Sequence, residues 1–243
     1  MRAPPKLTVP GLLALLLVAG VLMYLERREG GGSVPPAVET AGARTAGAAA
    51  DFDYYALVLS WSPTHCESPE GQDDDAQCAP RNRRPYAFIL HGLWPQYERG
   101  YPEVCRVADS WVPQDVIDRM MDVMPGKGLI IHEYRKHGSC SGLAPRAYYE
   151  MARRIYDSVR IPERFRNPGE AQFLDPGDVV QAFVAANPQL KPGMIAVSCG
   201  GPGSRLREVR ICVGKSGGAR PCGANEEQAK LCRSTRMHVP PVR

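Results

Sequence analysis

The stretch IHEYRKHGSC, residues 131–140, concentrates side chains that can move protons. His132, Glu133, Lys136 and His137 fall within it, although the whole chain has only five histidines. If the stretch is helical, a turn of about 100° per residue places all four on one face. Glu133 is one turn from His137, so its carboxylate could orient that imidazole and favour its charged form. The pattern indicates acid–base chemistry; a solvated helix face is the alternative.

The same stretch does not suit a zinc hydrolase. Such a site needs H-E-x-x-H, with its histidines one turn apart. Here the spacing is H-E-x-x-x-H, so the rings of His132 and His137 diverge by about 140°. Lys136 places an ammonium group between them, which repels a metal ion and attracts a phosphate. We therefore expect no metal and no cofactor. A metal-dependent hydrolase built on the two histidines is the weaker alternative.

A second stretch, FILHGLWPQY at 88–97, places His91 directly after the apolar run 86–90. We expect this run, 86–90, to form a strand that delivers His91 at its C-terminal end. The glycine that follows permits a close approach of other groups to the backbone, as binding sites often require. Trp94 and Tyr97 offer aromatic surfaces on which a base could stack, and core packing is the alternative for each.

The remaining sequence predicts a domain of class α+β, because strands and helices mix without regular alternation. Apolar runs bounded by turn residues predict strands over 51–63, 86–90, 194–199 and 205–213. Apolar residues at helical spacing, with a proline near the start, predict helices over 110–126, 144–159 and 174–188. The polar stretch 68–84 is expected to be a surface loop.

The N-terminal part of the chain has a different composition. Residues 1–25 are largely apolar behind Arg2 and Lys6, which predicts a signal peptide or an uncleaved signal anchor in the inner membrane. The protein would then be periplasmic, anchored facing the periplasm, or secreted. Residues 26–50, rich in Gly, Ala, Pro and Ser, predict a flexible linker. From Asp51 onward the 25 basic and 23 acidic side chains nearly balance, so any polyanion site must be a local patch.

Eight cysteines are scattered through 51–243, the predicted domain, and no two form a C-x-x-C pair. This spacing argues against a zinc ribbon or a thioredoxin-like site. Behind an export signal, an even number of scattered cysteines predicts disulfides, and buried free thiols are the alternative.

Taken together, the two histidine segments resemble the active-site segments of the ribonuclease T2 family. The first is similar over FILHGLWP and the second over HEYRKHGSC. Tyr134 stands where the family usually has tryptophan, and Ser139 where it usually has threonine. Three other stretches also look like the family: DFDYYALVLSWSPTHC at 51–66, YPEVC at 101–105 and VSCGGPGSRLREVRICV at 197–213.

The resemblance implies a central antiparallel sheet flanked by helices and stapled by disulfides. It also implies an enzyme that cleaves single-stranded RNA without a metal, through attack of the 2′-OH on its own phosphodiester to give a 2′,3′-cyclic phosphate. An inactive RNA- or protein-binding module of the same fold is the alternative. No obligate protein partner is implied. The implied pairs are Cys66–Cys78, Cys105–Cys140, Cys199–Cys232 and Cys212–Cys222.

The resemblance also implies roles for individual residues. His137 would be the base and His91 the acid, while Lys136 and Glu133 stabilise the transition state and His132 holds the phosphate. One histidine must be neutral while the other is charged, so we expect a bell-shaped dependence of activity on pH.

Overall fold

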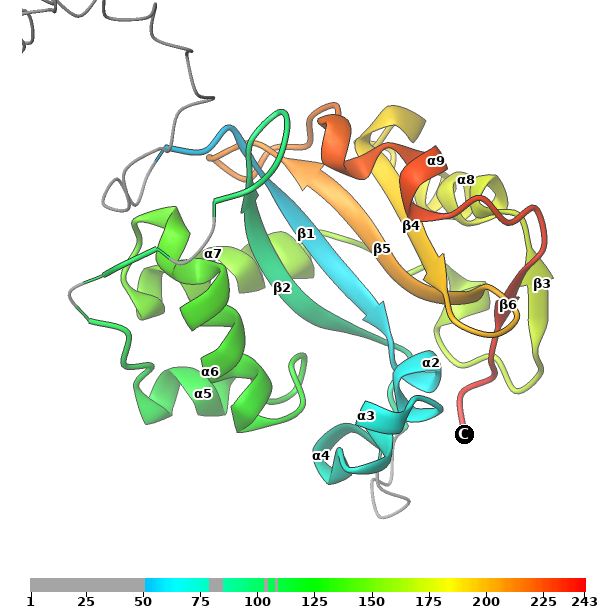
Figure 1. The fold of residues 1–243 in the computed structure, drawn as a ribbon, viewed down its shortest axis with the longest axis horizontal. Coiled ribbons are helices and arrows are strands. Elements are labelled where there is room, and N and C mark those ends of the chain that lie inside the picture. The colour runs from blue at the N-terminus through cyan, green and yellow to red at the C-terminus, as the bar shows by residue number, and fades with distance from the viewer. Residues whose placement is uncertain (1–50, 79–84, 103–104, 108) are drawn as a thin grey trace, which may run out of the picture. The chain divides into compact units, whose positions relative to one another are not determined.

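The computed structural model describes residues 51–78, 85–102, 105–107 and 109–243, and the predicted leader and linker, 1–25 and 26–50, lie outside them. A single six-stranded sheet forms the centre, in the order β2-β1-β5-β6-β3 with β4 paired to β5 (Figure 1). Every pairing is antiparallel except one parallel bridge between β5 and β6. The strands are β1 (Tyr54–Trp61), β2 (Phe88–Gln96), β3 (Gln172–Leu174), β4 (Ile195–Gly200), β5 (Arg205–Val213) and β6 (Met237–Val239).

Helices flank the sheet, which confirms the predicted α+β class. Helices α5 (Gln114–Met120), α6 (Lys127–Lys136) and α7 (Pro145–Asp157) gather beside β2, whereas α8 (Pro176–Ala186) and α9 (Gln228–Leu231) lie beside β4 (Figure 1). Three short helices follow β1: α2 (Ser62–Cys66), α3 (Pro69–Gln72) and α4 (Asp75–Cys78). Single 3-10 turns are Gly138–Ser141, Glu163–Phe165, Pro192–Met194 and Ala224–Glu226.

Strand β1 runs through the middle of the core. All of its residues are buried except Ser60, which is half-buried, and this explains its almost continuous apolar sequence. At its end Trp61 meets the ring of Phe88 edge-on at 4.8 Å, and Phe165 and Phe183 complete the cluster. Edge-on aromatic pairs of this kind each contribute about 0.5–1.5 kcal/mol beyond the area they bury. Packing in the core therefore holds β1 in place between β2 and β5.

A β-bulge in β2 sets the position of His91. The prediction that the strand ends just before this residue, at 90, is wrong, because β2 continues to Gln96. The pairing of β1 with β2 shifts between Val58 and Leu59, which leaves His91 as an extra residue. Leu90 and Leu93 on either side are fully buried, while His91 stays partly open to solvent. Bulges redirect single side chains in this way, because the extra residue breaks the alternation of the strand.

A second bulge lies in β5, on the other side of β1. The pairing of β4 with β5 shifts so that Arg207 is the extra residue. Leu206 and Val209 are fully buried, and the polar side chains Glu208 and Arg210 remain partly exposed. Since Gly92 and Arg210 both pair with Val58 of β1, the first bulge and the polar residues of β5 lie at the same level of the sheet.

Two expected segments differ from the structure. The helix predicted over 110–126 is shorter, since α5 starts only after Pro113, which is its N-cap. Proline can start a helix but cannot continue one, so the residues before it are not helical. Part of the expected loop 68–84 is helical, in α3 and α4, and residues 79–84 lie outside the described residues. The helix predicted over 174–188 is confirmed as α8, where Asp175 forms a capping box with Asp178.

Four disulfides cross-link the described chain: Cys66–Cys78, Cys105–Cys140, Cys199–Cys232 and Cys212–Cys222. These are the pairs that the family resemblance implies. The bond between Cys105 and Cys140 ties the segment after β2 to the turn after α6. Among the residues that the structure places, no helix has the length and apolar character needed to cross a membrane.

Candidate active site

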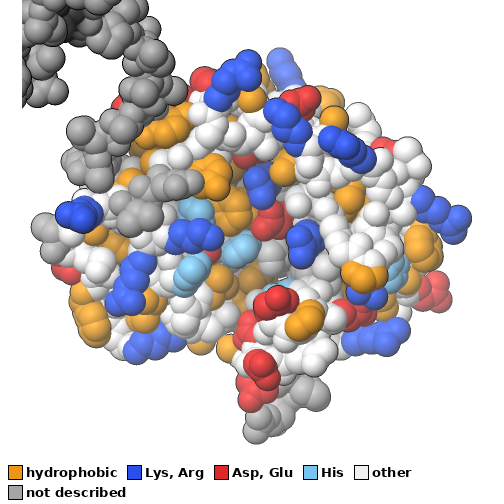
Figure 2. Space-filling view, viewed as in Figure 1, with side chains coloured by type: hydrophobic (Ala, Val, Ile, Leu, Met, Phe, Trp, Pro, Cys, Tyr) orange, Lys and Arg blue, Asp and Glu red, His pale blue; other side chains and the backbone are white. Residues whose placement is uncertain are grey.

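The indole of Trp94 is the common contact of the two predicted histidines. The His137 ring stacks on it, with centroids 4.6 Å apart and planes 23° apart, and the His91 ring meets it edge-on at 5.3 Å. Its Nε1 donates a hydrogen bond of 2.7 Å to Oε2 of Glu133. Figure 2 shows histidine side chains near the middle of the face that is turned to the viewer, close to both basic and acidic side chains. Two imidazoles from separate segments thus meet a carboxylate at one place.

His91 lies between two carboxylates. Its Nδ1 is 3.2 Å from Oε1 of Glu208, and its Nε2 is 3.6 Å from Oε1 of Glu133. Burial favours the neutral ring, but the hydrogen bond to Glu208 and the negative charge of Glu133 outweigh it and raise the pKa of His91. A raised pKa keeps this imidazole charged to a higher pH, as a proton donor requires.

His137 has the opposite environment. Its residue is only 8% exposed, and burial lowers its pKa to about 3, helped by the positive charges of Lys136 and His91. The prediction that Glu133 favours the charged form of His137 is wrong, because the Glu133 carboxylate faces His91 and Trp94 instead. The resulting neutral imidazole can accept a proton.

Glu133 is buried, at 2% exposure, where helix α6 approaches β2. Burial raises its pKa, while the charge of His91 and the hydrogen bond from Trp94 act against that rise. The approach depends on Gly92. A Cβ atom there would lie 2.2 Å from Glu133 Oε2 and 2.6 Å from Trp94 Nε1, so no side chain fits. The glycine after His91 therefore permits the close approach expected from the sequence.

Lys136 and His132 lie at the exposed edge of the site. Both come from helix α6, and both act electrostatically on Glu133 and on His137. The predicted shared face thus divides into two buried residues and two exposed ones. The ammonium group of Lys136, next to a buried carboxylate and a neutral imidazole, suits a phosphate that enters from solvent.

Tyr97 and Tyr134 take structural positions. Tyr97 follows the end of β2, and its half-buried ring packs against the hydrophobic core, which was the alternative expected for it. Tyr134, the departure from the family pattern, is buried against Tyr148, and its hydroxyl donates to the carbonyl of Leu143. This substitution is therefore accommodated inside the core.

Sequence reasoning missed Glu208 and Arg210. Nη2 of Arg210 lies 2.8 Å from Glu208 Oε2, and its guanidinium carbon lies 5.0 Å from the centre of the Trp94 ring. Burial acts to raise the pKa of Glu208, but the hydrogen bond to His91 and the charge of Arg210 lower it to about 2. The available signal was the alternation of charged with apolar residues in REVRI, residues 207–211, inside a predicted strand.

A cavity of about 640 Å³ opens beside His91. Glu208 and Arg210 line it from β5, and α2 and α3 form its other wall. Within the described residues, one group of possible metal ligands lies close together, namely His65, Asp74 and Cys78. The sulfur of Cys78 is bonded to Cys66, so it is not available as a thiolate.

Comparison with known proteins identifies the class. The model of the ribonuclease T2 family matches residues 52–222. A ribonuclease of Aeromonas hydrophila is 35% identical over 70% of this chain and 76% of its own length. A probable ribonuclease of Haemophilus influenzae is 27% identical over 69% of this chain, and the match spans only 60% of that protein. The chain belongs to the ribonuclease T2 family and is a ribonuclease of T2 type.

A solved structure has the same fold. RNase NT in complex with 5′-AMP superposes with a TM-score of 0.57, at 22% identity, over 79% of this chain and 99% of its own.

Proposed function

We propose that the enzyme cleaves single-stranded RNA internally, without a metal ion, by attack of a ribose 2′-OH on the adjacent phosphodiester. The observation that carries the proposal is the contact of two imidazoles with one indole, with the pKa of one raised and that of the other lowered. A neutral base and a charged acid are then present at the same pH, as this reaction requires.

In the proposed reaction His137 removes the proton of the 2′-OH. The oxygen attacks phosphorus and a new P–O bond forms, while the bond to the 5′-oxygen breaks. His91 gives its proton to that oxygen. The products are a 2′,3′-cyclic phosphate and a free 5′-OH, and water can then hydrolyse the cyclic product. DNA lacks the 2′-OH and is not cleaved in this way.

Charge that develops on the phosphate oxygens needs positive partners. Lys136 and His132 are exposed at the edge of the site and would provide them. Glu133, held between His91 and Trp94, would position the charged His91 and so support the transition state indirectly. The neighbouring cavity leaves room for part of the RNA chain.

Incubation of the purified domain with single-stranded RNA and excess chelator tests the proposal. We expect products with 2′,3′-cyclic phosphate ends despite the chelator. Loss of cleavage in chelator, restored by zinc, would indicate a metal enzyme instead. RNA binding without any cleavage would indicate an inactive binding module, for which no feature of the site argues.

We also propose that residues 51–243 form the catalytic domain of an exported protein. Four disulfides support an oxidising compartment, since such bonds rarely persist in the cytosol. Cell fractionation combined with mass measurement of the mature protein tests export, and the mass also reports whether residues 1–25 are removed or remain as an anchor.

A further inference from the structure

We propose that Glu208 is a positioning residue that holds His91 in the orientation and charge state needed to donate a proton, and that Arg210 fixes Glu208 in place. This inference rests on the proposed role of His91 as the acid. It adds two residues of strand β5 to a site otherwise formed by β2 and α6.

The two oxygens of Glu208 have separate partners. Oε1 accepts from Nδ1 of His91 at 3.2 Å, and Oε2 accepts from Arg210 at 2.8 Å. Only 13% of the Glu208 side chain is exposed, and 18% of that of Arg210. With both oxygens engaged in a largely buried position, the carboxylate has little freedom to rotate.

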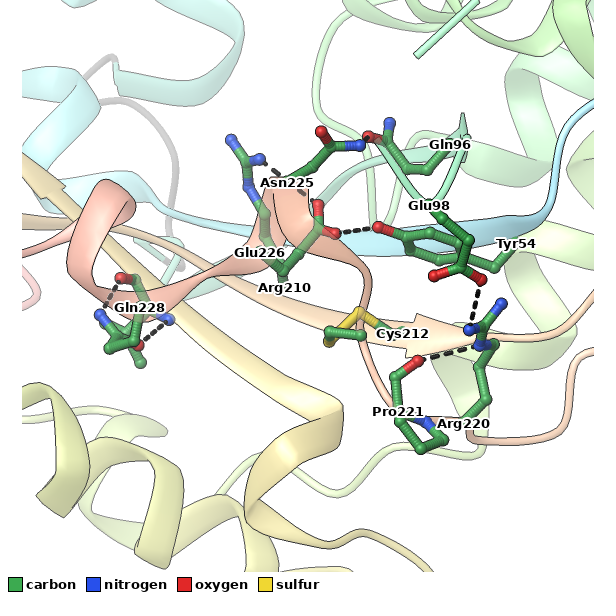
Figure 3. The surroundings of a disulfide bond; sticks show 12 residues. Tyr54, Gln96, Glu98, Arg210, Cys212, Arg220, Pro221, Asn225, Glu226 and Gln228 are labelled. Atoms are coloured by element: carbon green, nitrogen blue, oxygen red, sulfur yellow. Dashed lines mark hydrogen bonds and ion pairs between the residues drawn. A yellow bond between two sulfur atoms is a disulfide. The ribbon is translucent and has the colours of Figure 1, made fainter. Parts of the chain in front are cut away.

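Arg210 has a second acidic partner. Its Nη1 lies 3.7 Å from Oε1 of Glu226, whose side chain is fully buried and accepts a hydrogen bond from the hydroxyl of Tyr54 (Figure 3). Two residues further along β5, Cys212 is bonded to Cys222 (Figure 3). The guanidinium also lies over the ring of Trp94. Arg210 thus connects Glu208 to the indole on which His137 stacks.

The contact at Nδ1 also decides where the mobile proton sits. A carboxylate at Nδ1 keeps a proton on that nitrogen, so the proton that His91 can release is the one on Nε2. Nε2 is the ring nitrogen that lies near Glu133. The groups that face His91 from the neighbouring elements are Glu133 and His137 from α6 and its C-cap, and Glu208 and Arg210 from β5.

Two substitutions test the inference. Glu208→Gln keeps the size and removes the negative charge, so the pKa of His91 should fall. Arg210→Gln removes a positive charge that lowers the pKa of His91, but it also leaves Glu208 free to turn away, so that pKa should change less than in Glu208→Gln. NMR titration of the His91 imidazole without RNA measures both. An equal shift in the two variants, or no shift in Glu208→Gln, would overturn the inference.

Kinetics give a second measurement. In Glu208→Gln the alkaline limb of the plot of kcat against pH should move to lower pH. At pH values above that limb kcat should be about tenfold lower or more, since a tenfold change corresponds to a shift of one pKa unit. KM should change less than kcat, because Glu208 acts through His91. Glu208→Asp should recover part of the loss. Glu163→Gln is the matched control. Glu163 is an exposed glutamate that pairs with Arg166, and it lies far from Glu208 in the sequence.

The outcomes separate the two proposals. If the wild-type enzyme does not cleave RNA but the titrations shift as expected, the proposed function fails and the positioning contact stands. If RNA is cleaved but the His91 titration is unchanged in Glu208→Gln, with fold retained by circular dichroism, the positioning role is wrong. If Glu208→Gln does not fold, Glu208→Asp decides instead: its shorter side chain weakens the contact, so the pKa of His91 should fall, and an unchanged His91 titration would show that the positioning role is wrong.

Discussion

Nδ1 of His91 and Oε1 of Glu208 lie 3.2 Å apart, although 117 residues separate them in the chain. They come from β2 and β5, the two strands on either side of β1. His91 is the extra residue of the bulge in β2, and Glu208 follows the extra residue of the bulge in β5. The raised pKa of His91 thus depends on a carboxylate from a strand distant in the sequence, whereas the lowered pKa of His137 follows mainly from burial.

His137→Ala should slow RNA cleavage strongly and keep the fold. Loss of a general base typically reduces the rate by about 10²–10⁴-fold. The measurement is the initial rate of cyclic-phosphate formation, with circular dichroism to check folding. His238→Ala is a matched control, since His238 also stacks on an aromatic ring, that of Phe173, at 5.1 Å and 24°. An unfolded His137→Ala protein would favour a structural role for this histidine.

His137 should also make the domain less stable in acid. Its folded-state pKa of about 3 lies below its ordinary value of 6.5, so the unfolded chain takes up a proton more readily. The stabilising contribution is complete above pH 6.5 and is lost as the pH falls towards 3, at no more than about 1.4 kcal/mol per pH unit. Denaturant unfolding at several pH values measures this. His137→Phe keeps a ring on Trp94 without a titrating group, and equal acid sensitivity in both proteins would contradict the assignment.

Gly92→Ala should disturb the site without removing any catalytic group. The new methyl group would lie 2.2 Å from Glu133 Oε2, so the carboxylate and the indole of Trp94 must move. We expect a loss of about 1–3 kcal/mol in unfolding free energy, as for other overpacked sites, together with lower kcat. Gly169→Ala is the control, because a Cβ atom there meets no atom within 4 Å. Wild-type activity in Gly92→Ala would show that the Glu133–Trp94 contact is dispensable.

Removal of the Cys105–Cys140 disulfide should reduce both stability and activity. The bond joins cysteines 35 residues apart in the sequence. Such bonds typically contribute about 2–4 kcal/mol to the free energy of unfolding. Cys140 lies three residues after His137, so the double serine variant should also loosen that imidazole and lower kcat. The Cys66–Cys78 pair, separated by 12 residues, gives a comparison variant whose kcat should change less. Equal changes in kcat for the two variants would argue against this specific role.

The sequence by itself determined the class of fold, the helix α8 with its Asp175 cap, and the two segments that carry the histidines. These depend on local properties: apolar spacing, capping residues and short motifs. It also pointed to Gly92 as a place of close approach. It did not show that β2 continues past His91, because a bulge arises from the register between two strands and leaves no local signal in either.

Only the tertiary structure decided the partners of each ionisable group. Because Glu133 and His137 are one helical turn apart in the sequence, their spacing predicted that they would pair. In the folded chain the Glu133 carboxylate instead faces His91 and Trp94. Glu208 and Arg210 enter the site from a strand distant in sequence. The direction of a pKa shift depends on burial and on charges a few ångströms away, and both are set when segments remote in the chain pack together.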